Sequence, residues 1–176
     1  MLRKIFLLLL ACSMGATFAY AQQGRGRFQD RSTIVVTVDG LSCNNNSQGA
    51  IPVLSFSFGV TQPASTSTGS GSAAGRASLS DVSITRRADS CTPVLFGASV
   101  TGKIFKQVTI VQQDTQKDDT FTVTLNDVLI SSFQLGGDQS HEVPSEQIGF
   151  SYDKICVADT GTGTKACWDL RLARTF

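Results

Sequence analysis

The chain contains few of the residues on which active sites and metal centres depend. Among its 176 residues there is one histidine, and charged residues make up only 16%. Its five cysteines include no C-x-x-C pair, the spacing typical of structural zinc sites. Lysine plus arginine and aspartate plus glutamate number 15 and 14, so charge offers no reason to expect binding to nucleic acid or to an anionic membrane. These shortages argue against a metalloprotein and a nucleic-acid-binding protein.

Catalytic motifs are also scarce. A Ser-His-Asp triad could in principle be formed by Ser140, His141 and Asp138. Residues this close in sequence rarely adopt the geometry of a triad, and the sequence contains no nucleophile-elbow motif. We therefore interpret His141 as a solvated loop residue. Asp118 and Asp119 favour a hydrated turn over a metal site or a glycosidase pair, because adjacent side chains in an extended chain point apart. The sequence predicts no enzyme, no catalytic residue, no metal and no cofactor.

The one long apolar run lies at the N-terminus. Basic residues in Leu2–Lys4 precede an apolar stretch that begins with Ile5–Leu10, and Ala19-Tyr-Ala21 fits the small-x-small cleavage rule. We predict a Sec-type signal peptide over residues 1–21 and an exported mature chain, periplasmic or secreted, that starts at Gln22. After the leader no run approaches the roughly 20 apolar residues that span a bilayer.

A lipoprotein is the minor alternative for the N-terminus. Leu9-Leu-Ala-Cys12 resembles a lipobox, which would anchor the chain at Cys12. The apolar run before Cys12 is short for that class of leader, and Leu10 fits its position poorly. Cleavage after Ala21 is therefore the favoured prediction.

The mature chain is predicted to be a single domain preceded by a short arm. Residues 22–32 are rich in glycine and glutamine and carry Arg25, Arg27 and Arg31, which indicates a solvated, flexible arm. Residues 33–176 fit one domain in length.

Alternating and β-branched segments predict a mainly β fold. Phe121, Val123 and Leu125 alternate with threonines, which is the period of a half-buried strand. We expect strands over 33–39, 51–60, 79–85, 107–112, 120–126, 129–135, 148–157 and 165–172.

One short helix is expected between these strands. Thr92 suits the N-cap, Pro93 the first turn and Gly102 the C-terminal end. Its apolar face is predicted to be Val94, Leu95, Ala98 and Val100. The fold class is therefore a β-barrel or sandwich with one short α-helix.

A segment of small polar residues interrupts the strands at 61–77. Its composition cannot bury apolar area, so we predict a mobile loop within the domain rather than a domain boundary. Gly69–Gly75 superficially resembles a phosphate-binding loop, but it lacks the Walker lysine and the βαβ context.

Four cysteines remain after removal of the leader, an even number that favours disulfides in an exported chain. Three pairings are open. A type II′ turn with Gly161 at its first central position would place Cys156 opposite Cys167, which leaves Cys43 for Cys91. That register makes Cys156 and Cys167 a hydrogen-bonded pair, whose wider spacing suits a disulfide less well. Zinc is the weaker alternative, given the single histidine.

Arg86 and Arg87 follow the predicted strand at 79–85. Either could form an ion pair with Asp89 or with a carboxylate of a neighbouring subunit. A surface pair of little energetic consequence is the default expectation.

Several blocks of sequence resemble one family. Val82-Ser-Ile-Thr-Arg-Arg-Ala-Asp89, then Pro93-Val-Leu-Phe96 and Thr101-Gly-Lys103, resemble the Hcp (haemolysin-coregulated protein) family. Leu54–Gln62 and Asn126–Ser132 do so as well. No block is specific alone, but the set follows the family's order from about residue 34 to the C-terminus.

The resemblance implies a structural protein. Hcp proteins are the tube subunits of bacterial type VI secretion systems: they close into hexameric rings, stack into a tube and carry small effector proteins. Self-association would thus be expected, with threonines and glutamines of 107–112 and 120–126 suited to a wet lumen wall. In the family a long loop that helps ring stacking follows the strand that corresponds to 51–60.

The leader departs from the family's pattern, because Hcp tubes assemble in the cytoplasm and leave through a contractile apparatus. The alternative function is therefore an exported Hcp-like binding module that does not polymerise and serves no type VI machine.

Overall fold

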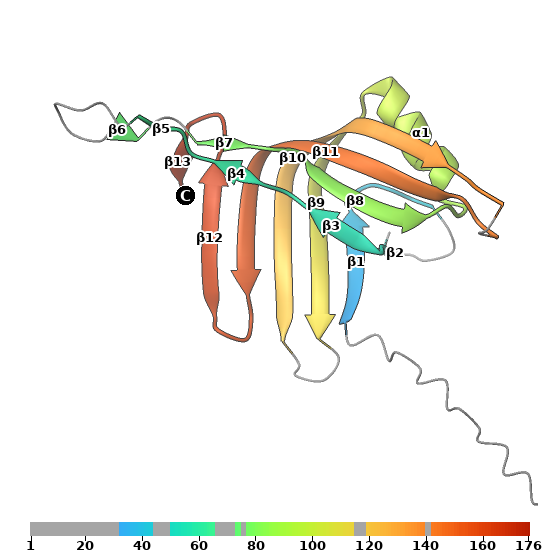
Figure 1. Cartoon of the computed structure of the whole chain (residues 1–176), viewed down its shortest axis with the longest axis horizontal. Coiled ribbons are helices and arrows are strands. Elements are labelled where there is room, and N and C mark those ends of the chain that lie inside the picture. The colour runs from blue at the N-terminus through green and yellow to red at the C-terminus, as the bar shows by residue number, and fades with distance from the viewer. Residues whose placement is uncertain (1–31, 44–49, 66–72, 75–76, 115–118, 140–141) are drawn as a thin grey trace, which may run out of the picture.

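The computed structural model describes residues 32–43, 50–65, 73–74, 77–114, 119–139 and 142–176 (Figure 1). The predicted leader and the arm up to Arg31 lie outside these residues. The strands are β1 (Ser32–Val38), β2 (Ala50–Pro52), β3 (Ser55–Ser57), β4 (Val60–Thr61), β5 (Ala64–Ser65), β6 (Ala73–Ala74), β7 (Ser78–Leu79), β8 (Val82–Arg87), β9 (Ile104–Asp114), β10 (Thr120–Gly136), β11 (Ser145–Asp159), β12 (Thr164–Asp169) and β13 (Arg174–Thr175). Within the described residues α1 (Thr92–Thr101) is the one helix. The predicted mainly β, Hcp-like fold with a short helix is confirmed.

The main sheet returns on itself around the core. Its order is β13-β12-β11-β10-β9-β1-β2, and β11 also pairs with β8, which pairs with β3. Because β2 and β3 follow one another along the chain, the circuit from β11 through β10, β9, β1, β2, β3 and β8 leads back to β11. We refer to this circuit as the barrel.

A kink between β2 and β3 joins the two halves of the circuit. The Val53 N–H donates to the Ile34 carbonyl oxygen (N···O 3.1 Å), and the Leu54 N–H donates to the Thr85 carbonyl oxygen (2.8 Å). The same segment therefore hydrogen-bonds to β1 on one side of the kink and to β8 on the other. The continuous strand expected over 51–60 is therefore broken, and Leu54 is exposed at the break.

The long strands bend at one level of the barrel. The strands predicted at 120–126 and 129–135 form a single strand, β10, in which Asp127 has a positive φ of 55°. Buried residues alternate along β10, but at this bend two consecutive residues are not buried before the alternation resumes. The same occurs at the matching levels of β9 and β11. The buried residues on either side of this irregularity are Leu125 and Val128 in β10, Phe105 and Val108 in β9, and Tyr152 and Ile155 in β11. This irregularity in all three strands bends the sheet around the core, and each strand continues through it.

The helix lies at one end of the barrel and packs on β10 (Figure 1). Gly102 adopts the left-handed conformation (φ 63°) at its C-terminus, as predicted. Two details differ from the prediction. Thr92 is the first helical residue rather than the cap, since Cys91 holds that position. Only Leu95 and Ala98 of the expected apolar face are buried, whereas Val94 and Val100 are exposed.

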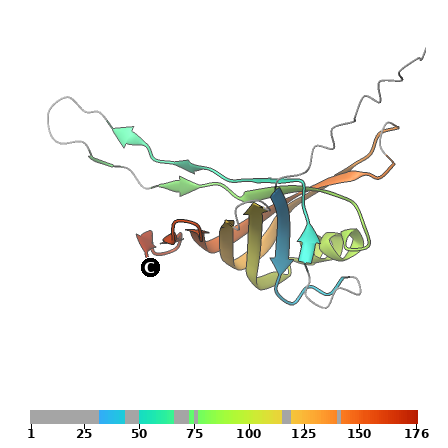
Figure 2. The same cartoon turned by 90° about the horizontal axis from the view of Figure 1, so that it is seen from below.

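The segment predicted as a loop at 61–77 extends from the barrel (Figure 2). In its described part, β4 pairs with β7 and β5 with β6. The chain therefore leaves and re-enters the barrel as a paired ladder.

A buried ion pair connects β8 to β11. Arg86 and Glu146 lie directly opposite in the two strands, are 0% and 1% exposed, and join Nη1 to Oε1 at 2.7 Å. Arg86 Nη2 also contacts Asp89 Oδ2 at 2.5 Å. The expectation of a surface ion pair was wrong for Arg86, because the register of β8 on β11 places its side chain inside the barrel. Arg87, the next residue, is exposed.

We predict that Glu146→Gln lowers the free energy of unfolding by about 3 kcal/mol, because the partly exposed Asp89 must then balance the buried Arg86 charge without Glu146. Urea denaturation measures the change. Arg86→Met/Glu146→Leu should recover most of the loss, since it removes both buried charges and leaves without its cation only Asp89, which is partly exposed. The exposed control Arg87→Ala should stay within about 0.5 kcal/mol of wild type. A Glu146→Gln loss no larger than that of the control would contradict this role.

Candidate assembly surfaces and their residues

The outer face of the sheet carries threonines across three neighbouring strands, with Val35 and Val111 paired on the same face. Thr37, Thr109 and Thr124 lie side by side in β1, β9 and β10, and the row continues into Cys156 of β11. The inward-facing Val123 and Leu125 are fully buried, which confirms that Thr122 and Thr124 belong to the opposite face. Phe121, on the inward face, is 38% exposed because it lies at the open end of the barrel. The face offers hydroxyl groups to solvent or to a polar surface, and few charges.

The open sheet edge in β12 can pair with another chain. β13 covers β12 only at Trp168 and Asp169, so among the described residues no strand pairs with the outer edge over 164–167. Such an edge presents unpaired N–H and carbonyl groups to another strand. At the other end of the same path lies the three-residue strand β2.

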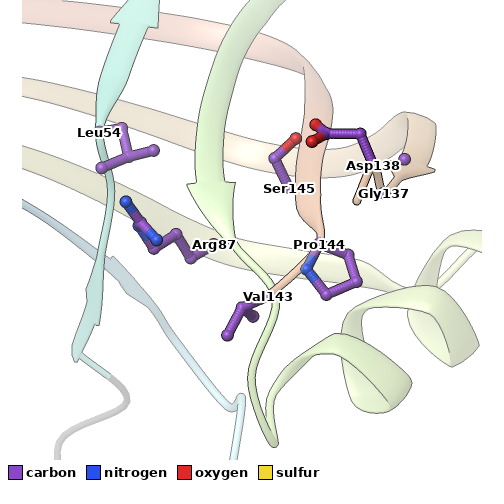
Figure 3. Close-up of a pocket in the computed structure, with 8 residues that line it drawn as sticks. Leu54, Arg87, Gly137, Asp138, Val143, Pro144 and Ser145 are labelled. Atoms are coloured by element: carbon purple, nitrogen blue, oxygen red, sulfur yellow. The ribbon is translucent and has the colours of Figure 1, made fainter. Parts of the chain in front are cut away.

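A small groove lies beside the exposed Arg87 (Figure 3). It has a volume of about 140 Å³ and brings together the end of β8, the residue before β3 and the two ends of the β10–β11 connection. Its lining consists of Leu54, Arg87, Gly136, Gly137, Asp138, Val143, Pro144 and Ser145. Among the described residues that line it, the charged side chains are one cation, Arg87, and one carboxylate, Asp138, beside the apolar Leu54, Val143 and Pro144.

The structure joins four of the five cysteines as two disulfides. Cys43 is bonded to Cys91, with a Cα–Cα distance of 4.9 Å, and Cys156 to Cys167, with a Cα–Cα distance of 4.1 Å. The first joins the segment after β1 to the start of α1. The second crosses β11 and β12 on the threonine-bearing face.

The β11–β12 turn differs from the predicted two-residue turn. Asp159 pairs with Thr164, so the connection has four residues, and Gly163 rather than Gly161 has a positive φ (67°). The centre of the turn is unchanged, so Cys156 still faces Cys167. Because the turn is two residues longer than predicted, hydrogen-bonded and non-hydrogen-bonded pairs exchange places along the hairpin. The Cα–Cα distance of 4.1 Å between Cys156 and Cys167 is that of a non-hydrogen-bonded pair. The expected difficulty with the wider spacing therefore does not arise.

We predict unequal stabilisation by the two disulfides. They close segments of 48 and 11 residues, so the chain-entropy relation gives losses of about 4 kcal/mol for Cys43→Ala/Cys91→Ala and about 3 kcal/mol for Cys156→Ala/Cys167→Ala. Urea denaturation without reductant compares the two double variants. A larger loss from the second would contradict the prediction.

Tyr152 is held in a polar cluster beside the bend of β10. Its hydroxyl donates to the Ser80 carbonyl oxygen (3.0 Å), and the Ser131 hydroxyl donates to Asp81 Oδ2 (2.5 Å). Burial, assisted by the negative charge of Asp81, raises the pKa of Tyr152 to about 12. The fold thus favours the neutral phenol.

The mature chain contains one tyrosine if cleavage follows Ala21, because Tyr20 is then lost. We predict that tyrosinate absorbance titrates with a pKa of about 12 in the folded protein. The stabilisation linked to this group is fully present below the ordinary pKa of about 10 and is lost as the pH rises through about 12. Tyr152→Phe should abolish the signal. Titration near pH 10 in the folded protein would show that the phenol is not held this way.

Most of the candidate catalytic residues named in the sequence lie outside the described part of the chain. Asp138 lines the groove, while Ser140, His141 and Asp118 lie outside the described residues. Asp119 is exposed at the β9–β10 turn. In the described part of the chain, no three His, Cys, Asp or Glu side chains gather in a way that could hold a metal ion. No described helix is long and apolar enough to cross a membrane.

These features define a β-barrel domain with exposed strand edges, and comparisons identify its family. The profile of the family described as "Type VI secretion system effector, Hcp" matches residues 27–158, which is 132 of 176 residues. The chain therefore belongs to the Hcp family. Hcp proteins are secreted, structural tube proteins of type VI secretion systems, and the family is not one of enzymes. None of the curated protein sequences matches significantly.

Solved structures of Hcp proteins share the fold. Hcp1 from Salmonella typhimurium superposes with a TM-score of 0.67 at 20% identity, over 83% of this chain and 99% of that one. A type VI secretion system effector from Yersinia pestis has a TM-score of 0.61 at 25% identity, over 77% and 98%. The secreted protein Hcp3 from Pseudomonas aeruginosa gives 0.59 at 19%, over 78% and 96%. The resemblance seen in the sequence is thus confirmed.

Proposed function

We propose that the mature chain is an exported subunit that self-associates into rings, that the rings stack into a tube, and that the lumen carries small effector proteins. The match to the Hcp family over residues 27–158 is the main support. The unpaired edge of β12 and the threonine-bearing outer face of β1, β9 and β10 supply surfaces of the required kind. Contact between two different edges is heterologous, and it closes into a ring when the rotation between subunits allows it.

The pairing of β12 with β11 indicates which backbone groups of β12 are available for contact between subunits. In antiparallel strands the residues of non-hydrogen-bonded pairs direct their N–H and carbonyl groups away from each other. Cys156 and Cys167 form such a pair, and so by alternation do Ala158 and Lys165. The Lys165 N–H therefore points away from β11, toward a strand of the next subunit.

A second function is favoured by the two disulfides. Disulfides are rare in the cytoplasm, where type VI tubes assemble, and they agree with the signal peptide that we propose for residues 1–21. The alternative is an exported binding module that keeps the Hcp fold, does not polymerise and serves no type VI machine. Oligomeric state separates the two functions.

We predict that Lys165→Pro prevents self-association while leaving the hairpin intact, because proline removes an outward N–H that β11 does not use. The dissociation constant of the subunit contact should rise about tenfold or more. Light scattering after gel filtration measures the mass over a concentration series. Lys165→Ala, which removes the side chain and keeps the N–H, is the matched control and should assemble. Equal assembly by both variants would exclude the β12 edge as the contact.

A further inference from the structure

The two disulfides differ in their access from solvent. Cys43 and Cys91 are 6% and 4% exposed, and their bond lies at the start of α1. Cys156 is 9% exposed, but its partner Cys167 is only partly buried and belongs to β12, at the edge of the sheet (Figure 1). Among the described residues no strand covers the outer side of β12 before Trp168. A reagent in solution therefore reaches the second disulfide more easily than the first.

Little apolar packing holds the end of the hairpin that carries this disulfide. Residues 164–166 of β12 are exposed, and Val157 of β11, opposite one of them, is only partly buried. Along β12, packing against the core begins at Trp168. A segment with few buried apolar contacts opens at a lower free-energy cost than the core. Between the turn and Trp168, β12 is therefore held to β11 by the strand ladder and by the bond between Cys156 and Cys167.

Two lysines flank this bond on the outer face of the sheet. Side chains two residues apart in a strand share a face, so Lys165 lies beside Cys167 and Lys154 beside Cys156. Lys154 also faces Asp169, with Nζ 3.9 Å from Oδ2, whereas Lys165 is exposed. A nearby cation favours a thiolate over a thiol, and a disulfide is cleaved faster when its leaving thiolate is more stable. The lysines therefore favour attack on this bond by an anionic thiolate.

We propose that Cys156–Cys167 is a thiol–disulfide exchange site, which a dithiol reduces in the folded protein while Cys43–Cys91 stays oxidised. One thiolate of the dithiol attacks the Cys167 sulfur, the S–S bond breaks, and Cys156 leaves as a thiolate that takes up a proton. The second thiol of the reagent loses its proton and attacks the reagent's own sulfur in the mixed disulfide, which releases Cys167 as a thiol. The dithiol ends as a cyclic disulfide, and two electrons and two protons pass to the protein.

Reduction at this site loosens the edge of the sheet and leaves the barrel folded. Trp168 packs against the core, and Asp169 Oδ1 accepts a hydrogen bond from the Leu172 N–H (2.8 Å), so this end of β12 is held without the disulfide. Residues 164–167 then remain attached through the strand ladder alone. The exposed edge of β12 is thereby placed under redox control. The inference concerns the single subunit, and it does not depend on ring formation.

Timed reduction followed by alkylation tests the proposal. The oxidised protein is treated with dithiothreitol in native buffer, free thiols are trapped with excess iodoacetamide, and peptide mass spectrometry measures the label on each cysteine. Cys156–Cys167 should be reduced about tenfold or more faster than Cys43–Cys91, because the hairpin end opens at a lower cost than the start of a packed helix. Hydrogen exchange of the partly reduced protein should rise over residues 164–167 and stay unchanged in β8.

Lys165→Glu should slow reduction of Cys156–Cys167 about threefold at about 0.1 M salt, because it repels the incoming thiolate. Lys106→Glu makes the same change of charge on the exposed part of β9, two strands away from β11, and is the matched control with an unchanged rate. Equal rates for the two wild-type disulfides would overturn the proposal. Intact masses that pass directly from no label to four labels would overturn it too, because reduction would then follow global unfolding.

Discussion

The buried contact between Arg86 and Glu146 is the point through which the separate parts of the fold are connected. Arg86 of β8 binds Glu146 of β11 and Asp89, and Asp89 Oδ1 accepts a hydrogen bond from the Cys91 N–H at the start of α1 (2.7 Å). Cys91 is in turn bonded to Cys43, after β1. Two strands, the helix and the first connection of the barrel therefore share one network. A charge held in the interior is tolerated only with such partners, so the network fixes the register of β8 on β11.

Features that depend on local pattern could be predicted from the sequence, and features that depend on long-range pairing could not. The alternation in β10 and the end of α1 at Gly102 follow from neighbouring residues. The burial of Arg86 does not, because it requires that Glu146, 60 residues away, lies opposite. The kink at Val53–Leu54 likewise arises because one segment pairs with two distant strands. Val94 and Val100 show the same limit: an apolar helix does not reveal which of its faces a sheet will cover.

The family of this protein and its disulfides favour different compartments for assembly. The Hcp fold is one whose strand edges and threonine-bearing wall suit assembly, and the match covers most of the chain. The pair Cys156–Cys167 lies on the wall itself, and the two disulfides favour folding in an oxidising compartment. On the export route that we propose, such a subunit would assemble after export rather than before it.

Negative-stain electron microscopy of the mature chain, purified from the periplasm without reductant, tests this account most directly. We predict rings, alone or stacked into tubes, because the β12 edge and the barrel wall are complete in the oxidised subunit. Repeating the experiment after reduction shows whether the disulfides support assembly. Small single particles at every concentration at which Hcp proteins assemble would contradict the account, and the exported binding module would then be the function that the fold serves.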